Sequence, residues 1–289
     1  MPLVIVKHFK AVYGEDVLEK MLEKITEEKH LSLTVNTQKI NREELMAKLS
    51  DYSPSASEYT ESGIILGAKI PPAKLPGFEN GEFFVQDASS QIAVDALSAD
   101  VGMLVVDVCA APGGKSFGAA IKVKDTGSVF SFDIHESKLS LIDTGAKRLG
   151  LYNVKPACRD ALSADEALIG KADRVICDAP CSGLGVLSKK PDIRYKDLSV
   201  IDELPPLQYS ILCESAKYLK VGGIMLYSTC TLNPSENEDI TDKFVNEHSN
   251  FAYEKISTAK LSSESGKLTL LPHIHGTDGF FIALIKRMD

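Results

Sequence analysis

Two cysteines stand just beyond two apolar runs in the C-terminal half of the sequence. Cys181 follows the run Arg174–Asp178, Cys230 follows the run Ile224–Ser228, and small or turn-forming residues flank both. A thiolate can add to an electron-poor carbon, and a carboxylate such as Asp178 can take part in the accompanying proton transfers. The pattern predicts covalent catalysis by a thiol.

Methylation of a pyrimidine ring is one reaction that needs two such groups. Addition of a thiolate to C6 makes the otherwise unreactive C5 nucleophilic toward a sulfonium methyl group. A second acid–base group must then remove the C5 proton so that the thiolate can leave. Asp178 could instead cap a helix after its loop. The remaining cysteines are interpreted as small hydrophobic spacers: Cys109, Cys158, Cys177 and Cys213.

A segment with the pattern strand, turn and helix precedes these cysteines. The apolar run Leu104–Val108 leads into small residues that include Gly113 and Gly114, so backbone N–H groups can approach a ligand closely. The next apolar run ends at Asp133, where a carboxylate can accept both hydroxyls of a ribose. Together these features predict a nucleoside-bearing cofactor.

Three cofactors compete for this loop. A phosphate-binding loop of the Walker A type would need glycine where Cys109 stands, so ATP is a weak alternative. A dinucleotide fingerprint would need two glycines in positions that Cys109 and Ala111 occupy, which disfavours NAD. S-adenosylmethionine remains as the favoured cofactor, and a tight turn that binds no ligand stays open.

Alternating strand and helix patterns must position these groups. The order predicts an α/β fold with a doubly wound, Rossmann-like parallel sheet, in which the loop and both cysteines share the carboxyl edge. We expect strands at Leu104–Val108, Val129–Asp133, Arg174–Asp178 and Ile224–Ser228, helices at Glu136–Leu149 and Leu207–Leu219, and an added edge strand at Gly279–Ile285.

The N-terminal part has a different pattern. Residues from about 7 to 50 show helical spacing interrupted by a strand-like stretch at Leu31–Asn36. Tyr52–Asn80 is rich in Ser, Pro and Gly and is interpreted as a connecting region with short strands. We expect a small mixed α/β domain and connector at residues 1–80 and a second domain at residues 81–289, with strand and helix alternation from Phe83 onward.

Composition limits the classes of protein. The 289 residues are 44% hydrophobic and carry a net charge of -8, so a nucleic-acid site must be a local patch. Apolar runs stay well short of the roughly 20 residues of a membrane-spanning helix, and the first residues lack a signal-peptide pattern. The cysteine spacing favours neither disulfides nor a metal site. We expect a cytoplasmic monomer that binds neither membrane nor metal.

Three motifs in one order carry a resemblance to a known family. Cys109–Lys115, Asp178–Gly183 and Ser228–Glu238 resemble the motifs of the RsmB/Nop2/Sun family of RNA 5-methylcytosine methyltransferases, which depend on S-adenosylmethionine. The resemblance continues at Gln86–Gln91, Lys190–Tyr195 and Asp278–Ala283. Among the branches of the family, the sequence is most similar to the bacterial RsmB branch, which methylates one cytosine of 16S ribosomal RNA.

The resemblance implies a role for each matching residue. Cys230 would attack C6 of cytosine, Cys181 would assist loss of the C5 proton and release of the enzyme, and Asp178 would lie between methyl donor and base. Asp133 would bind the ribose of S-adenosylmethionine and Asp160 would lie beside its adenine. The methionine end of the cofactor would be lined by Cys109, Ala110, Ala111, Pro112, Gly113, Gly114 and Lys115. After the transfer, the cofactor leaves as S-adenosylhomocysteine. Lys115 is either a charge partner within the site or a solvated lysine.

Members of the RsmB branch usually carry a further N-terminal RNA-binding domain, and this sequence begins about where the connector after that domain would lie. We therefore expect weaker affinity for the RNA substrate, which is ribosomal RNA by this resemblance. Phosphate contacts would suit the local basic groups Lys189, Lys190, Arg194, Lys196, Lys7, His8 and Lys10. A tRNA cytosine-C5 methyltransferase, a non-catalytic RNA-binding ribosome-assembly factor and a P-loop nucleotide hydrolase remain alternatives.

Overall fold

The computed structural model describes residues 2–26, 30–67, 70–195 and 200–289 of the chain. An eight-stranded sheet has the order β10-β14-β9-β8-β5-β6-β7, with β13 also paired to β14. Its parallel strands are β5 (Leu104–Asp107), β6 (Ser128–Asp133), β7 (Val154–Cys158), β8 (Ala172–Asp178) and β9 (Leu219–Thr229). Its antiparallel strands are β10 (Phe251–Tyr253), β13 (Lys267–Leu270) and β14 (Phe280–Arg287).

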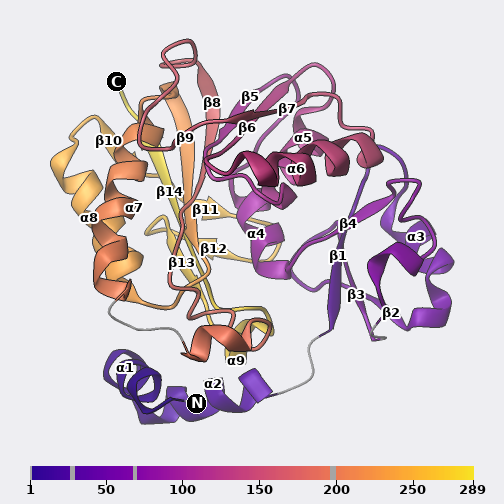
Figure 1. Cartoon of the computed structure of the whole chain (residues 1–289), viewed down its shortest axis with the longest axis horizontal. Coiled ribbons are helices and arrows are strands. Elements are labelled where there is room, and N and C mark those ends of the chain that lie inside the picture. The colour runs from indigo at the N-terminus through magenta and orange to yellow at the C-terminus, as the bar shows by residue number, and fades with distance from the viewer. Residues whose placement is uncertain (1, 27–29, 68–69, 196–199) are drawn as a thin grey trace.

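Both faces of this sheet are buried. Neighbouring residues of a strand point to opposite faces, so consecutive apolar residues enter two different cores. On β5, Val105 belongs to one core and Val106 to the other. The helices α4 (Ala88–Ala96), α5 (Gly114–Val123) and α6 (Glu136–Leu149) cover the Val105 face. The helices α7 (Val200–Ala216) and α8 (Glu238–Glu247) cover the Val106 face (Figure 1). The predicted doubly wound sheet is confirmed.

Strand β14 does not lie at the edge that its sequence predicts. It pairs with β9 on one side and with β10 and β13 on the other. Six of its eight residues, Phe280–Ile285, are buried, with Phe281 and Ile282 on opposite faces. The apolar character of the strand reflects this internal position, and the prediction of an edge strand at Gly279–Ile285 is wrong.

Helix boundaries agree with the sequence pattern to different degrees. Helix α6 has the predicted bounds, and it ends at Gly150, which adopts the left-handed conformation that glycine tolerates. Helix α7 begins seven residues before the predicted Leu207 and ends at Ala216, because β9 starts at Leu219. Pro205 and Pro206, which are typical of a helix start, lie inside α7.

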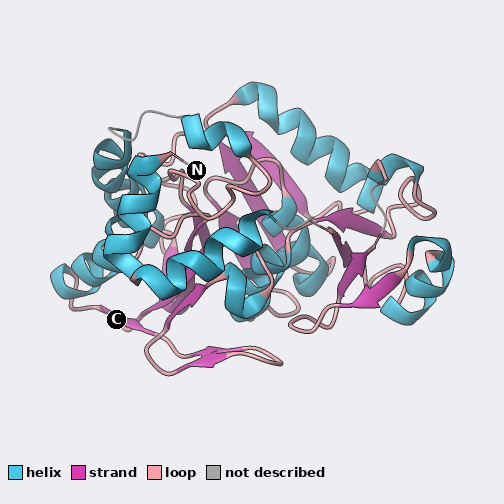
Figure 2. Ribbon diagram, turned by 90° about the horizontal axis from the view of Figure 1, so that it is seen from below, coloured by secondary structure: helices cyan, strands magenta, loops and turns pink. Residues whose placement is uncertain are grey.

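A smaller antiparallel sheet has the order β2-β3-β1-β4. Its strands are β1 (Leu31–Val35), β2 (Pro54–Ala56), β3 (Gly63–Leu66) and β4 (Phe83–Val85), and the helix α3 (Arg42–Lys48) packs beside them. Tyr52–Asn80 is therefore part of this sheet rather than only a connector. Strand and helix do alternate from Phe83 onward, but β4 pairs with β1 and so belongs to the small sheet. Figure 2 shows the small sheet beside the large one.

The first two helices pack away from the small sheet. Helices α1 (Leu3–Tyr13) and α2 (Glu15–Thr26) lie near α9 (Pro272–His275), as Figure 1 shows. Ile5 and Phe9 of α1 are buried against Leu184 and Leu232, which follow β8 and β9. The N-terminal helices thus support the backs of the two loops that carry the cysteines. In the described ranges, no helix has both the length and the apolar character needed to cross a membrane.

Candidate active site

The carboxyl ends of β5, β8 and β9 meet where the chain reverses the direction in which it adds strands, the usual place for a ligand in an α/β sheet. A cavity of about 420 Å³ opens there. The predicted site residues that line it are Cys109, Ala111, Asp133, Asp160, Asp178, Cys181 and Cys230. This edge of the sheet therefore gathers residues from the ends of five strands, β5 to β9, and the loops that follow them.

The two thiols of this cavity are adjacent. Cys181 Sγ lies 3.1 Å from Cys230 Sγ, and both cysteines are half-buried free thiols. The hydrogen bond from Cys181 has the largest effect on the pKa of Cys230 and lowers it, against burial and Asp178, with help from Lys115 and Lys190. The same bond, together with burial, raises the pKa of Cys181 well above the ordinary value. Cys230 is thus the thiol that ionises first and Cys181 the one that keeps its proton.

Asp178 is held in place through both carboxylate oxygens. Lys115 Nζ lies 2.7 Å from Oδ2, and the hydroxyl of Ser228 donates to Oδ1 at 2.7 Å. The side chain of Lys115 is only 10% exposed, so it is a charge partner within the site rather than a solvated lysine. Asp178 does not cap a helix, because the next helical residue along the chain is Pro191.

The loop after β5 turns sharply beneath the cavity. Gly113 has a φ of 113°, and a side chain there would meet the ring of Phe117, so the turn requires glycine. The N–H of Ala111 donates to Asp133 Oδ2 at 3.2 Å, which joins this loop to the end of β6. Asp160 is exposed at the cavity and accepts the N–H of Leu162 at 2.9 Å, as at the start of a turn.

A smaller cavity of about 190 Å³ lies beside the same loop. Predicted residues that line it are Cys109, Ala110, Ala111, Pro112, Gly114, Lys115 and Asp178. Cys109, Ala111 and Asp178 border both cavities. The loop therefore separates two spaces at the sheet edge, and Gly113 supports the turn between them.

Asp107, at the end of β5, should make the stability of the folded chain depend on pH. Burial, partly opposed by the hydroxyl of Ser116 at 2.7 Å, raises the pKa of Asp107 to about 7. The unfolded chain would ionise this carboxyl near the ordinary value of 3.8. The free energy of unfolding should therefore fall as pH rises from about 4 to about 7, by on the order of 4 kcal/mol from this group. Relative to wild type, Asp107→Asn should gain stability over that window in urea titrations.

Asp125→Asn is the matched control for that measurement, because Asp125 is exposed. Its stability difference from wild type should stay constant between pH 4 and pH 7. A constant difference for Asp107→Asn as well would show that the folded chain ionises Asp107 at its ordinary pKa.

The predicted phosphate-binding residues lie in different settings. Lys189 forms ion pairs with Asp87 and Asp278, and its side chain stays about one-third exposed, so a phosphate there would compete with these two carboxylates. Lys190 lines the 420 Å³ cavity. Lys10 pairs with Glu15, and Lys196 lies outside the described residues.

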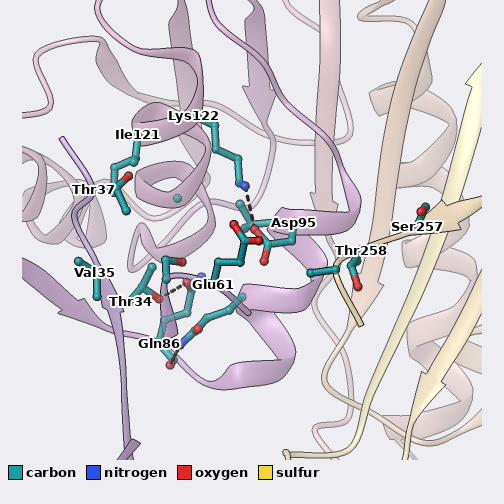
Figure 3. Close-up of a pocket in the computed structure, with 15 residues that line it drawn as sticks. Thr34, Val35, Thr37, Glu61, Gln86, Asp95, Ile121, Lys122, Ser257 and Thr258 are labelled. Carbon is teal, nitrogen blue, oxygen red and sulfur yellow. Dashed lines mark hydrogen bonds and ion pairs between the residues drawn. The ribbon is translucent and has the colours of Figure 1, made fainter. Parts of the chain in front are cut away.

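A second cavity of about 440 Å³ lies away from the thiols, between β1, α4, α5 and the chain around Thr258 (Figure 3). Lys122 pairs with Asp95 at 2.8 Å in its wall, and Thr34 donates to Gln86 at 2.9 Å. Gln86 and Gln91 of the motif Gln86–Gln91 line it, but none of the predicted catalytic or cofactor-binding residues does. The chemistry of the side chains, rather than cavity size, identifies the candidate active site.

The sequence interpretation missed the residues that hold the site from behind. Glu236 is fully buried, and its carboxylate accepts hydrogen bonds from Ser182 and Asn233, which follow Cys181 and Cys230. Ser228, the partner of Asp178, was also missed. The available signal was Glu236 itself, a charged residue inside the motif Ser228–Glu238. If such a carboxylate is buried, it needs hydrogen-bond donors nearby.

All six cysteines are free. Within residues 2–26, 30–67, 70–195 and 200–289, no group of three or more His, Cys, Asp or Glu side chains has an arrangement that could hold a metal ion.

Two family models match the sequence. Residues 94–286 match the model described as 16S rRNA methyltransferase RsmB/F. Residues 1–71 match the model of the ferredoxin-like domain of RsmF/B-like methyltransferases. These matches cover most of both sheets described above.

Individual proteins are also similar to this chain. A Bacillus subtilis protein named probable ribosomal RNA small subunit methyltransferase B is 36% identical over 299 residues, which cover 99% of this chain and 66% of that protein. A Synechocystis protein of the same name is 35% identical, with 96% and 65% covered. The chain thus spans about two thirds of the length of these relatives. A crystal structure described as a methyltransferase homologue from Pyrococcus horikoshii is 26% identical, with a TM-score of 0.83 and 100% of both chains covered.

Proposed function

Because this chain belongs to the RsmB/F family of 16S rRNA methyltransferases, we propose that it transfers a methyl group from S-adenosylmethionine to C5 of a cytosine in small-subunit ribosomal RNA. The observation that carries the proposal is the pair of sulfur atoms, 3.1 Å apart, in the wall of a cavity that Asp133 and Asp178 also line. A nucleophile and a separate acid–base group are what methylation at C5 requires.

The cavity suits the cofactor in size and chemistry. About 420 Å³ lies within the range of cavities that hold molecules of this size. Asp133 would accept the ribose hydroxyls, Asp160 would lie beside the adenine, and the loop from Cys109 to Lys115 would hold the methionine end. When bound, S-adenosylmethionine supplies an electrophilic methyl group on a positively charged sulfur.

Cys230 begins the reaction as a thiolate. Its lone pair forms a bond to C6 of the cytosine, and the C5–C6 π pair then makes C5 the nucleophile. The lowered pKa of Cys230 supports this role, because the thiolate is the reactive form of cysteine. The thiol proton of Cys181 passes to the cytosine ring as negative charge builds on it.

Cys181, now a thiolate, completes the reaction. After methylation, its sulfur takes the C5 proton, the electron pair of that C–H bond restores the C5–C6 double bond, and the bond from C6 to Cys230 breaks. The proton that the ring received leaves to solvent, and both thiols return to their starting states. Asp178, fixed by Lys115 and Ser228, would orient the cytosine edge rather than carry protons.

The RNA must present a single base to this cavity, because C5 and C6 of a stacked base cannot both be reached. Lys190 lies at the cavity and could contact a phosphate beside the target. We assign RNA placement to the N-terminal part, residues 1 to about 80, in a chain that acts as a monomer. The small sheet itself continues to Val85.

The test is methylation of defined RNAs. The protein is incubated with unmodified 16S ribosomal RNA and, separately, with unmodified tRNA, each with S-adenosylmethionine carrying a labelled methyl group, and nucleosides are separated by mass spectrometry. We expect labelled 5-methylcytosine at one position of the ribosomal RNA. Label in tRNA alone would indicate a tRNA enzyme, and cofactor binding without label in either RNA would indicate a non-catalytic RNA-binding factor.

A further inference from the structure

Glu236 lies behind the two thiols and does not reach the cavity that they line. It ends the short helix Pro234–Glu236 after β9, and its side chain is completely buried. A carboxylate in such a place must receive hydrogen bonds on both oxygens to offset the loss of water. Its donors are therefore informative about what it holds.

Those donors come from both cysteine loops. The N–H of Ser182, next to Cys181, donates to Oε2 at 2.8 Å, and the Ser182 hydroxyl donates to Oε1 at 2.7 Å. Asn233 Nδ2, three residues after Cys230, donates to Oε1 at 3.1 Å. One side chain thus connects the segments that carry the two sulfur atoms.

Helix α7 adds a third support. Gln208 Nε2 donates to Glu236 Oε2 at 3.0 Å and to the carbonyl of Pro180 at 2.9 Å. The hydroxyls of Ser182 and Thr231 are 2.8 Å apart, which links the two loops a second time. These contacts lie on both sides of Cys181, at Pro180 and Ser182, and directly after Cys230, at Thr231 and Asn233. The position of each sulfur therefore depends on the carboxylate.

From these contacts we infer that Glu236 is a positioning residue that holds Cys181 and Cys230 in hydrogen-bond contact and thereby makes Cys230, rather than Cys181, the reactive thiol. The inference rests on the proposed function for its meaning in catalysis, while the contact between the thiols can be tested without RNA. Two features of Glu236 act together. Its reach fixes the geometry, and its negative charge beside Cys181 favours the protonated form of that thiol.

Other charged and titratable groups lie near the two thiols and Glu236, and their charge should change as little as possible during the test. Asp178, Lys115 and Lys190 surround Cys230, and His8 of α1 and Tyr227 of β9 lie near Glu236. Burial lowers the pKa of His8 in spite of Glu236, so His8 stays neutral above pH 7. The measurement is therefore made from pH 7 to pH 10.

The experiment is alkylation of the full chain with iodoacetamide, followed for each cysteine by peptide mass spectrometry. In Glu236→Gln, the amide nitrogen cannot accept the bonds that one carboxylate oxygen receives. We expect the ratio of Cys230 to Cys181 alkylation at pH 7 to fall by about tenfold and the pH midpoint for Cys230 to rise by about one unit. Glu238→Gln removes the same charge two residues away, where Glu238 accepts from Thr269, and should keep the wild-type ratio and profile.

A second variant keeps the inference testable if Glu236→Gln does not fold. Ser182→Ala removes the hydroxyl that bridges Glu236 and Thr231 but leaves the charge, and it should give a smaller fall in the same ratio. If folded Glu236→Gln keeps the wild-type ratio and pH profile, or if Ser182→Ala alone folds and keeps them, Glu236 is not a positioning residue.

Methylation by the same proteins separates this inference from the proposed function. If the wild type methylates ribosomal RNA, Glu236→Gln should lower kcat by about tenfold with KM for RNA unchanged. Failure of the wild type to methylate any RNA would overturn the proposed function and leave the alkylation result standing. Methylation by the wild type with unchanged alkylation in Glu236→Gln would overturn the role of Glu236 alone.

Discussion

Cys181→Ala should accumulate a covalent complex between protein and ribosomal RNA in the presence of S-adenosylmethionine. Cys181 Sγ is 3.1 Å from Cys230 Sγ and is the base that we assign to the C5 proton. Without that base the methylated adduct cannot re-form its C5–C6 double bond, so Cys230 stays attached to C6. Asp178 cannot easily replace Cys181, because Ser228 and Lys115 occupy its two oxygens.

Denaturing gels with labelled RNA measure this complex directly. We expect a slowly migrating band that contains at least about ten times more RNA than the wild-type lane, and turnover at least about 10²-fold lower. Loss of the hydrogen bond from Cys181 should raise the pKa of Cys230 and slow adduct formation, so the band should grow more quickly at pH 9 than at pH 7. A Cys181→Ala protein that methylates at the wild-type rate without a band would show that another group removes the C5 proton.

Local signals in the sequence were sufficient for much of the large sheet. Leu104–Val108 and Val129–Asp133 are short apolar runs followed by turn residues, and strands form at both places. Glu136–Leu149 has clear helical spacing and a glycine directly after it, which specify the bounds of α6. Such elements are predictable because the signals lie within a few residues of each other.

Pairing between distant segments was beyond these signals. An apolar strand such as β14 has the same composition whether it lies inside a sheet or at its edge. It is internal here because β10 and β13 pair with its far side. The same holds for Phe83–Val85, which pairs back to β1 instead of beginning the large sheet. Strand neighbours depend on the whole topology rather than on the strand itself.

The candidate site shows the same limit at the level of side chains. Motif residues such as Cys181 and Cys230 were identifiable by type and spacing, because their chemistry is rare. Lys189 has the sequence environment of a surface lysine, yet two carboxylates that lie far away in the sequence, Asp87 and Asp278, surround it. Glu236 could not be assigned because its partners lie on three separate segments. Long-range electrostatic contacts are visible only once the fold is known.

Cys230→Ala should abolish both methylation and the covalent complex. Cys230 combines a lowered pKa, from the hydrogen bond that Cys181 donates, with a position in the wall of the candidate cofactor cavity. Without addition at C6, C5 of cytosine is too weak a nucleophile to react with the methyl donor, whichever other groups remain. We expect the rate of 5-methylcytosine formation to fall by at least about 10³-fold, and no band on a denaturing gel even at pH 9.

Two comparisons give this result its meaning. Cys213→Ala makes the same substitution on α7, at a half-buried thiol outside both site cavities, and should keep the wild-type rate. Cys230→Ala should still bind S-adenosylhomocysteine within a few-fold of wild type in calorimetry, because the assigned ribose and adenine contacts at Asp133 and Asp160 remain. The double variant Cys181→Ala with Cys230→Ala should form no complex, since the bond that would accumulate is never made. A covalent complex in either protein that lacks Cys230 would instead assign the attack on C6 to a different nucleophile, and Cys181, the adjacent thiol, would be the first candidate in the single variant.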